Sequence, residues 1–333
     1  MRNVLVTGGA GFIGAHVVRT LQTYEQFNVV VLDDLSGGFR DNVPDGVEFI
    51  EGSIMDNQLI DSLFEQYKFQ YVYHLAAYAA EGLSHFIRRF NYNNNLIGSI
   101  NLINASVIHK VERFVFTSSI AVYGSNQVPM IESMIPEPED PYGIAKYAVE
   151  MDLKTAHEMF GLEYCIFRPH NVYGEYQNIG DKYRNVVGIF MNKILRGEPM
   201  TVFGDGEQQR AFSYVGDIVG PMVESAWMDA TKNETFNIGA DIPYTVNVLS
   251  EEIARAMGKP NHPLDHLDAR NEVVIAYSDH SKAHSVFSNA PNTSLDEGLK
   301  KMADWVMEVG ARESTHFKEI EIYENLPPSW AKK

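Results

Sequence analysis

The sequence contains a single cysteine, Cys165, among its 333 residues. One thiol excludes an internal disulfide and is typical of a protein from a reducing compartment. Cys165 stands within the apolar run 164–167. We therefore interpret it as a core residue rather than as a nucleophile.

Positive charge is also scarce. Lys and Arg number 27 against 44 Asp and Glu, which gives a net charge of −17. Nucleic acids and anionic membranes bind clustered positive charge, so neither is expected as a partner. The sequence lacks an apolar run of about 18 residues and starts with a predicted strand rather than a charged and then apolar leader. We therefore expect a soluble cytoplasmic protein.

Short β-like runs alternate with helical patterns through the first half of the chain. Strands are predicted at 2–7, 28–33, 47–51, 71–75, 112–117 and 163–168, and helices at 12–24, 56–67, 90–109 and 142–160. This alternation predicts an α/β fold of the Rossmann type, a doubly wound parallel sheet that binds ligands beyond the carboxyl ends of its strands.

The second half is less regular, with helical patterns at 187–196, 249–257 and 294–309. A strand at 235–238 is expected to return to the main sheet. We predict an NAD-binding Rossmann domain over 1–172, joined by about 211–240, and a smaller mixed α/β substrate-binding domain over 173–333.

A glycine-rich turn, in the run VLVTGGAGFIG at 4–14, links the first strand to the first helix. Gly8 permits a sharp turn, Gly11 lets backbone N–H groups approach a pyrophosphate, and Gly14 lets the helix pack against the strand. The helix points its positive end at the phosphates. Asp33 lies 19 residues after Gly14, where a carboxylate accepts hydrogen bonds from a ribose and repels a 2′-phosphate. The pattern therefore predicts a binding site for NAD rather than NADP. The alternative is an ordinary turn without a ligand.

The following strand ends also suit a dinucleotide. The polar loop 35–38 suits the adenosine end, and Ile54 packs either on the adenine or in the core. Small residues at 75–77 let a cofactor backbone pass closely. We interpret His74 as a structural histidine, since no second residue with metal-ligand spacing accompanies it, and we predict no metal site.

Tyr142 and Lys146 lie one helical turn apart after the fifth predicted strand, which ends in Ser118 and Ser119. A free phenol has a pKa of about 10, too high for a base at neutral pH. A nearby ammonium and the charge of an oxidised nicotinamide lower that pKa. The pattern predicts removal of a proton from a sugar or alcohol hydroxyl while hydride leaves for NAD.

The helical pattern at 90–109 has a broad apolar face. One side can pack on the sheet and the other on a second subunit, which predicts a homodimer; burial within the monomer core is the alternative.

These motifs, with those at 74–77, 168–174, 203–206, 210–217 and 270–273, resemble the extended short-chain dehydrogenase/reductases. Within them the chain resembles NAD-dependent nucleotide-sugar epimerases of the UDP-glucose 4-epimerase type, over nearly its whole length. The resemblance implies C4 epimerisation of a UDP-glucose or UDP-galactose type sugar through a transient 4-keto intermediate.

The resemblance also implies roles for individual residues. Ser119, Tyr142 and Lys146 match the catalytic residues. Asn171, Arg210 and Arg270 match contacts to the substrate diphosphate, and Glu272 matches the acid that binds the nucleotide ribose. From the residues and the resemblance together, the predicted cofactor contacts are Gly8, Gly11, Phe12, Ile13, Asp33, Asp34, Leu35, Ser36, Gly37, Ser53, Ile54, Leu75, Ala76, Ala77, Asn95, Thr117, Tyr142, Lys146 and His170. The predicted substrate contacts are Ser119, Tyr142, Asn171, Val187, Phe203, Arg210, Arg270, Glu272 and Ala276.

The sequence departs from this family at several positions. Ser53 replaces the usual aspartate near the adenine, and His170 replaces an aromatic residue near the nicotinamide. The segment 78–89 is unusual, and its Glu81, His85 and Arg88 either contact an unusual hexose or lie on the surface. The small Ala276 leaves room for an N-acetyl group, so both plain and N-acetylated sugars are expected to fit.

Three alternatives remain open. A 4,6-dehydratase needs acidic residues after the catalytic hydroxyl, whereas Ile120, Ala121 and Val122 follow Ser119. Another nucleotide-sugar epimerase or a decarboxylase acting on a uronic acid is the second alternative. The third is a dinucleotide-binding protein without catalysis, against which the joint presence of serine, tyrosine and lysine argues.

Overall fold

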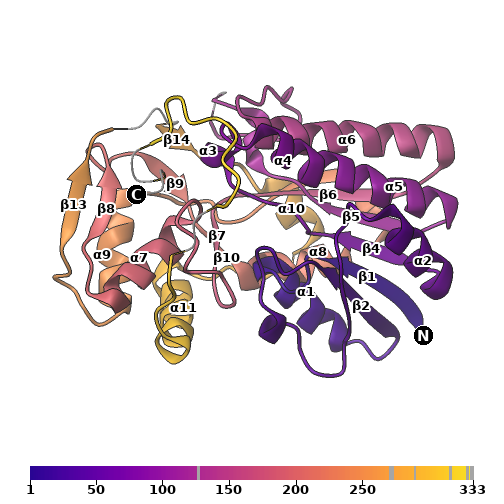
Figure 1. Ribbon diagram of the computed structural model, residues 1–333, viewed down its shortest axis with the longest axis horizontal. Helices are drawn as coiled ribbons and strands as arrows, with labels where there is room; N and C mark the ends of the chain where they lie inside the picture. The colour runs from indigo at the N-terminus through magenta and orange to yellow at the C-terminus, as the bar shows by residue number, and fades with distance from the viewer. Residues whose placement is uncertain (126–127, 270–273, 289, 315–316, 328–329, 331–333) are drawn as a thin grey trace.

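A seven-stranded parallel sheet forms the centre of the computed structural model (Figure 1), which describes residues 1–125, 128–269, 274–288, 290–314, 317–327 and 330. The strand order is β11-β6-β5-β4-β1-β2-β3, and every neighbouring pair is parallel. The strands are β1 (Arg2–Thr7), β2 (Phe27–Asp33), β3 (Glu48–Glu51), β4 (Tyr71–His74), β5 (Arg113–Thr117), β6 (Tyr164–Pro169) and β11 (Glu234–Ile238). The predicted doubly wound α/β fold is confirmed, and the order reverses between β1 and β4, where such sheets bind ligands.

Helices cover both faces of this sheet (Figure 1). On one face lie α1 (Phe12–Gln22) and α8 (Val215–Glu224), and on the other α2 (Asn57–Tyr67), α5 (Gly98–Ile108) and α6 (Pro141–Phe160). Successive residues of a strand point to opposite faces, so Val4 and Val6 pack with α1 and α8 while Leu5 packs with the other layer. Each layer therefore has its own apolar core.

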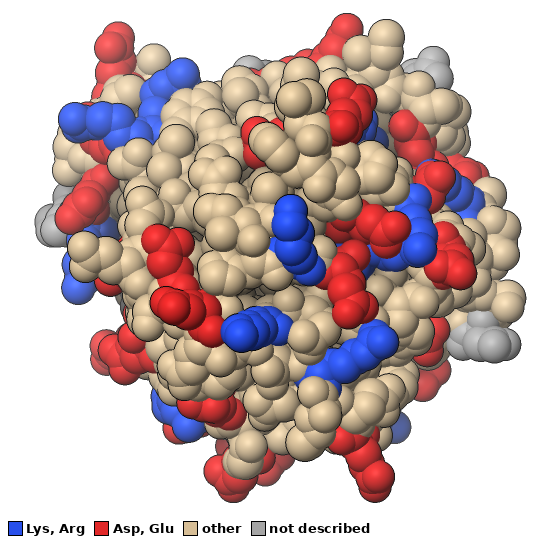
Figure 2. Space-filling view, turned by 90° about the vertical axis from the view of Figure 1, so that its right-hand side faces the viewer, with Lys and Arg blue, Asp and Glu red and all other residues tan. Residues whose placement is uncertain are grey.

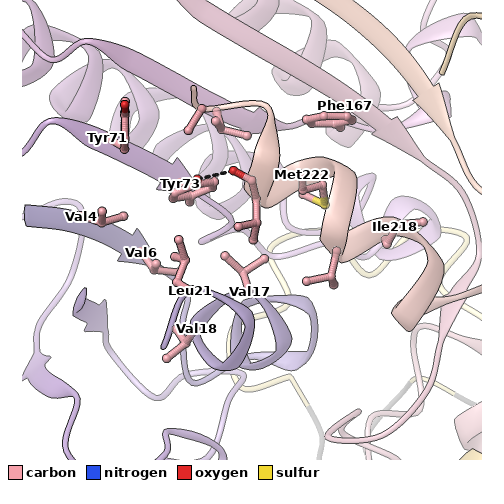
Figure 3. Packing of buried hydrophobic residues seen from close by; sticks show 14 of the residues in the cluster. Val4, Val6, Val17, Val18, Leu21, Tyr71, Tyr73, Phe167, Ile218 and Met222 are labelled. Atoms are coloured by element: carbon pink, nitrogen blue, oxygen red, sulfur yellow. Dashed lines mark hydrogen bonds between the residues drawn. The ribbon is translucent and has the colours of Figure 1, made fainter. Parts of the chain in front are cut away.

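Figure 3 shows the core between the sheet and the α1 and α8 helices. Val17 and Leu21 of α1 and Met222 of α8 lie in one cluster with Tyr73 of β4. The Tyr73 hydroxyl is buried and donates a hydrogen bond of 2.6 Å to the carbonyl of Val223, so this polar group is satisfied within the core.

The predicted helix at 90–109 is interrupted. It consists of α4 (Arg88–Tyr92), a π-helical turn (Asn93–Ile97) and α5. The Asn95 side chain turns inward there, accepting from the Tyr78 N–H and donating to the Asn91 side chain. Local side-chain hydrogen bonds of this kind compete with regular helix geometry.

Outside the main sheet, a further apolar core lies around α7 (Val186–Arg196), α9 (Val246–Ala256) and α11 (Leu295–Val309). Small sheets border it: β8 (Met200–Phe203) with β13 (Leu264–Leu267), β9 (Gln209–Ala211) between β12 (Pro243–Thr245) and β14 (Ile275–Ala276), and β7 (Val172–Tyr173) with β10 (Ser213–Tyr214). The short helices are α3 (Glu81–Ser84), α10 (Ser281–Val286) and the 3₁₀ turns Arg40–Asn42, Ile120–Tyr123 and Asp229–Thr231.

After α11 the chain runs back toward α3 and α4, drawn in yellow in Figure 1. None of the helices in the described ranges is both long and apolar enough to cross a membrane. Figure 2 shows acidic and basic side chains interspersed over one face of the molecule. Ion pairs such as Arg2–Glu112 and Lys232–Glu163 accompany the strand starts.

Candidate active site

A cavity of ≈ 1670 Å³ lies at the carboxyl ends of the central strands. It brings together residues that are far apart in the sequence. Of the predicted site residues, the lining includes Gly8, Gly11, Phe12, Ile13, Asp33, Asp34, Ser36, Gly37, Ile54, Leu75, Ala76, Ala77, Thr117, Ser119, Tyr142, Lys146, His170, Asn171, Phe203, Arg210 and Ala276. The glycine turn and the tyrosine–lysine pair thus share one cavity.

The glycine turn is too tight for side chains. Gly8 has φ +73°, and a Cβ on it would stand 2.6 Å from the backbone nitrogen of Ala76. A Cβ on Gly14 would stand 2.0 Å from the Gly8 oxygen. Gly11 is the N-cap of α1 and supplies no side-chain cap. The helix start is therefore open to an anionic ligand, as a pyrophosphate site requires.

Asp33 is held at the end of β2, beside this turn. Its two carboxylate oxygens accept the N–H groups of Ala10, at 3.0 Å, and of Leu35, at 2.8 Å. Burial raises the pKa of Asp33, and these backbone hydrogen bonds oppose the rise. The carboxylate is thereby fixed at the position predicted to face an adenosine ribose.

Tyr142 lies in the first turn of α6. Asp140 caps this helix by accepting the Gly143 N–H at 2.9 Å, and Pro141 occupies its first turn. Lys146 follows one turn later and donates from Nζ to the Thr117 carbonyl at 2.8 Å. The helix cap and the end of β5 thus fix both side chains at the cavity wall.

Two effects of the surrounding protein act on the pKa of Tyr142 in opposite directions. Burial raises the pKa of this phenol, and the strongest opposing effect is a hydrogen bond with the Ser119 side chain. Burial also lowers the pKa of Lys146 to about 7, while the Glu150 charge opposes this shift. Further positive charge at the phenol must come from a bound ligand.

Behind the cavity wall lies a buried charged network that the sequence reasoning missed. Glu150, one turn beyond Lys146, accepts from Arg168 Nε at 2.9 Å and from Nη2 at 2.5 Å. Glu150 also accepts from the Ser118 hydroxyl at 2.5 Å, and Arg168 donates to the Tyr123 hydroxyl at 2.6 Å. The network fixes the end of β5 against α6. Its signal in the sequence is the four-residue spacing of 142, 146 and 150 along one helix face.

His170 is buried at the end of β6. Its Nδ1 lies 3.0 Å from the Ala211 carbonyl, and its Nε2 lies 3.1 Å from Nε2 of His280. His280 Nδ1 lies 2.6 Å from the Asp241 carboxylate. Burial and then the His280 charge lower the pKa of His170 to about 3. Both ring nitrogens of His170 are thus used within the protein, so it borders the cavity as a neutral ring.

His74 and Cys165 lie in the interior. The His74 ring nitrogens lie 2.7 Å from the Thr7 hydroxyl and 2.8 Å from the Ser99 hydroxyl. Burial raises the pKa of Cys165 to about 12, which disfavours a nucleophilic thiolate. The interpretation of both as interior residues is confirmed.

Four predicted contacts are absent from the cavity lining. Leu35 packs against the apolar core beside β1, and the Ser53 hydroxyl accepts a hydrogen bond from the Met55 N–H. The Asn95 side chain is used in holding Tyr78, and Val187 is fully buried in the core around α7. Core packing and local hydrogen bonds thus account for all four. Arg270 and Glu272 lie outside the described residues.

Several lining residues carried no signal in the sequence. Arg184 lies there, paired with Asp181 at 2.7 Å. Asn94 lines the cavity in place of its neighbour Asn95. Asn325, Pro327 and Trp330 come from the end of the chain. Only the folded chain brings these segments to the site.

The residues present fit a bound dinucleotide. The glycine turn forms a cradle that any Cβ would fill, and α1 opens without a side-chain cap. The Thr117 Oγ1 atom is buried in the cavity wall and has no hydrogen-bond partner among the described residues. A buried hydroxyl without a partner is costly unless a ligand satisfies it.

Comparison with known proteins agrees with this geometry. Residues 4–239 match the model of the NAD dependent epimerase/dehydratase family. A putative UDP-glucose 4-epimerase of Methanocaldococcus jannaschii is 34% identical over 306 residues, which cover 91% of this chain and 98% of that protein. The crystal structure of UDP-glucose 4-epimerase with UDP-glucose from Thermotoga maritima has a TM-score of 0.86 and 37% identity, covering 92% and 99% of the two chains.

Dehydratases are also similar. The dTDP-D-glucose 4,6-dehydratase of Mus musculus is 28% identical over 342 residues, covering 98% of this chain and 95% of that protein. The sheet and the site together define a dinucleotide-binding enzyme fold. The chain belongs to the NAD-dependent epimerase/dehydratase family of extended short-chain dehydrogenase/reductases, and its cofactor is NAD.

Proposed function

We propose that the protein catalyses NAD-dependent C4 epimerisation of a nucleotide sugar of the UDP-glucose/UDP-galactose type. The observation that carries this proposal is the placement of Ser119, Tyr142 and Lys146 in one cavity with the glycine turn. A protein that only bound a dinucleotide would not need these three side chains. The sheet region, 1–172 with about 211–240, would bind NAD, and 173–333 would bind most of the nucleotide sugar.

When bound, oxidised NAD supplies a hydride acceptor and a positive charge that favours the Tyr142 phenolate. Tyr142 accepts the proton of the sugar C4 hydroxyl, and Ser119 holds the same oxygen by a hydrogen bond. The 4-keto sugar then turns about its diphosphate link and presents its opposite face. Tyr142 returns the proton to the inverted hydroxyl. Lys146, whose Nζ donates to the Thr117 carbonyl, would hold the cofactor ribose.

Asn171 and Arg210 line the same cavity and would grip the substrate diphosphate. Ala276 pairs with Arg210 in the sheet register of β14 and β9. Its small side chain leaves room for a C2 acetamido group. Both plain and N-acetylated sugars would therefore fit. If Ala276→Tyr leaves acetamido turnover unchanged, this part of the proposal is wrong.

The chain around Ser119 disfavours a dehydratase. Elimination of water across C5 and C6 needs a further acid and base, and the 3₁₀ turn after Ser119 is formed by Ile120, Ala121, Val122 and Tyr123. None of these side chains is acidic. An epimerase needs only the tyrosine and its partners, since the proton returns to the C4 oxygen and the hydride to C4 itself.

The experiment is incubation with UDP-, GDP- and TDP-sugars without added cofactor, followed by NMR of the C4 configuration. Inversion at C4 is expected, and Tyr142→Phe should abolish it. A 4-keto-6-deoxy product would indicate a dehydratase instead. Turnover only with stoichiometric added NAD would indicate a net dehydrogenase.

We further propose a homodimer that acts in the cytoplasm. Ile97 of the π-helical turn and Ile144 and Met151 of α6 are 45%, 40% and 53% exposed, and these two elements are neighbours, so they offer an apolar face to a second subunit. Sedimentation should show a dimer that Met151→Glu weakens. The single buried thiol, Cys165, suits a reducing compartment.

A further inference from the structure

The end of the chain forms part of the cavity wall. We call the described residues 317–327 and Trp330 the C-terminal segment. Asn325, Pro327 and Trp330 line the cavity that holds Ser119 and Tyr142. In Figure 1 this segment, in yellow, runs beside α3 and α4 rather than staying with the substrate half of the molecule.

Hydrogen bonds clasp the C-terminal segment to α4. The Glu321 carboxylate accepts the backbone N–H groups of Arg89 and Phe90, both at 2.9 Å. In return the N–H groups of Glu321 and Ile322 donate to the Phe86 carbonyl at 2.8 and 3.2 Å. The Glu321 side chain is 15% exposed, so its carboxylate is largely covered. Two hydrogen bonds to the carboxylate and two between backbone groups together fix the register of the segment.

Aromatic packing fixes it further. Trp330 is buried against Phe86 and Tyr183, with ring centroids 6.2 and 5.4 Å apart and edge-to-face geometry. Phe317 packs on Phe90, with centroids 4.9 Å apart. Such pairs contribute beyond their buried area. The C-terminal segment is therefore a built part of the site.

The segment borders the catalytic end of the cavity. A Cβ on Gly82 would stand 3.2 Å from Cη2 of Trp330, so the indole lies on α3. Two residues further along, the Ser84 hydroxyl accepts the backbone N–H of Tyr142 at 3.2 Å. The short helix α3 thus contacts both the indole and the start of α6, and Gly82, Tyr142 and Trp330 line one cavity. The adenosine-facing turn at Gly8 and Asp33 lies on other elements.

We propose that the C-terminal segment, through Trp330, is the wall that contacts the hexose and selects which nucleotide sugars react. The inference rests on the proposed function, since it assigns the sugar end of that same site. An aromatic ring offers an apolar face to the C–H groups of a hexose, while Asn325 offers hydrogen bonds to its hydroxyls. The residues proposed to hold the diphosphate, Asn171 and Arg210, lie on other elements, so binding of the nucleotide should not depend on the segment.

The test compares ligands that share the nucleotide and differ in the sugar. In the NAD-loaded enzyme, Trp330→Ala should raise the Kd of UDP-glucose about tenfold and leave the Kd of UDP within about twofold. Trp330→Phe should restore most of the lost affinity. The relative kcat/KM for UDP-glucose and UDP-N-acetylglucosamine should also change in Trp330→Ala. Equal effects on UDP and UDP-glucose would overturn the proposal.

A second pair of variants tests the clasp without touching the wall itself. Glu321→Gln can no longer accept both N–H groups well and should raise the Kd of UDP-glucose by several-fold. Glu319→Gln, on the same segment and exposed, is the matched control and should have no effect. Identical Kd values for the two variants would contradict the role of the clasp.

Amide hydrogen exchange separates this inference from the proposed function. UDP-glucose, but not UDP, should slow exchange at Glu321 and Ile322. Failure of the proposed function would appear as absence of C4 inversion for every sugar, whatever the exchange shows. Failure of the present inference would appear as exchange at these amides that both ligands leave unchanged, with turnover intact.

Discussion

Arg168 and Glu150 form a two-point ion pair in the interior, with Nε–Oε1 at 2.9 Å and Nη2–Oε2 at 2.5 Å. Their side chains are 3% and 0% exposed. The pair joins β6 to α6 and, through the Ser118 hydroxyl, reaches the end of β5. The catalytic Ser119 proposed here follows directly. The position of Ser119 therefore depends on an ion pair that lies behind the cavity wall and takes no part in the reaction.

Breaking this pair on one side should be costly. Glu150→Gln leaves the Arg168 guanidinium buried without its counter-charge, which typically costs about 3–5 kcal/mol. Replacing both, as Glu150→Leu with Arg168→Met, should cost much less than the sum of the single changes. Urea unfolding of the three variants measures this. The geometry indicates that the two residues are coupled. If the loss of stability in the double variant equals the sum of the losses in the two single variants, they are not coupled.

Gly14→Ala should remove the cofactor site. The added methyl group would stand 2.0 Å from the Gly8 oxygen, so the turn and α1 must move apart. We expect the variant to lose bound NAD, measured by its release on denaturation, and to unfold more easily. Gly220→Ala in α8 meets no atom within 4 Å and is the matched control. It should retain NAD and be as stable as the wild type or more so.

The sequence was sufficient for the parts of the fold that depend on local patterns. The alternation of strands and helices predicted the parallel sheet, and the glycines and Asp33 predicted the turn, because backbone sterics and spacing determine both. Packing decided the rest. The apolar side chains of Leu35 and Val187 pack in the apolar cores rather than at the cavity. Which of the two they face depends on neighbours that are distant in the sequence. No sequence motif indicates the approach of Trp330 to Gly82, since the two residues lie far apart in the sequence.

Lys146→Met should separate stability from activity. Burial lowers the pKa of Lys146 to about 7, so a charged ammonium at this position destabilises the folded chain at neutral pH. Methionine has a similar length and no charge, so the free energy of unfolding should stay equal or rise by about 1–2 kcal/mol. The proposed epimerase activity should fall by at least about 100-fold, since the proposed ribose contact and the charge near Tyr142 would be lost. A large loss of stability would show that its bond to Thr117 outweighs the desolvation cost.

Acid should destabilise the protein through its buried histidines. Burial lowers the pKa of His74 and of His170 to about 3, from an ordinary value of 6.5. As the pH falls through 6.5, the unfolded chain binds a proton at each histidine and the folded chain does not. The unfolded state is therefore favoured, by about 1 kcal/mol per histidine between pH 6.5 and 5.5.

The His74 part of this loss can be isolated. Ser99 donates its own proton to the Asn95 carbonyl, so its oxygen accepts from His74 Nε2, and Nδ1 accepts from Thr7. His74→Gln removes the titrating ring. Between pH 6.5 and 5.5 its free energy of unfolding should fall by about 1 kcal/mol less than that of the wild type, although the variant is less stable at the start. His266→Gln, on the exposed strand β13, is the control, since its side chain already meets water in the folded chain. Urea unfolding at both pH values measures the difference, and parallel losses in wild type and His74→Gln would show that His74 contributes nothing to acid lability.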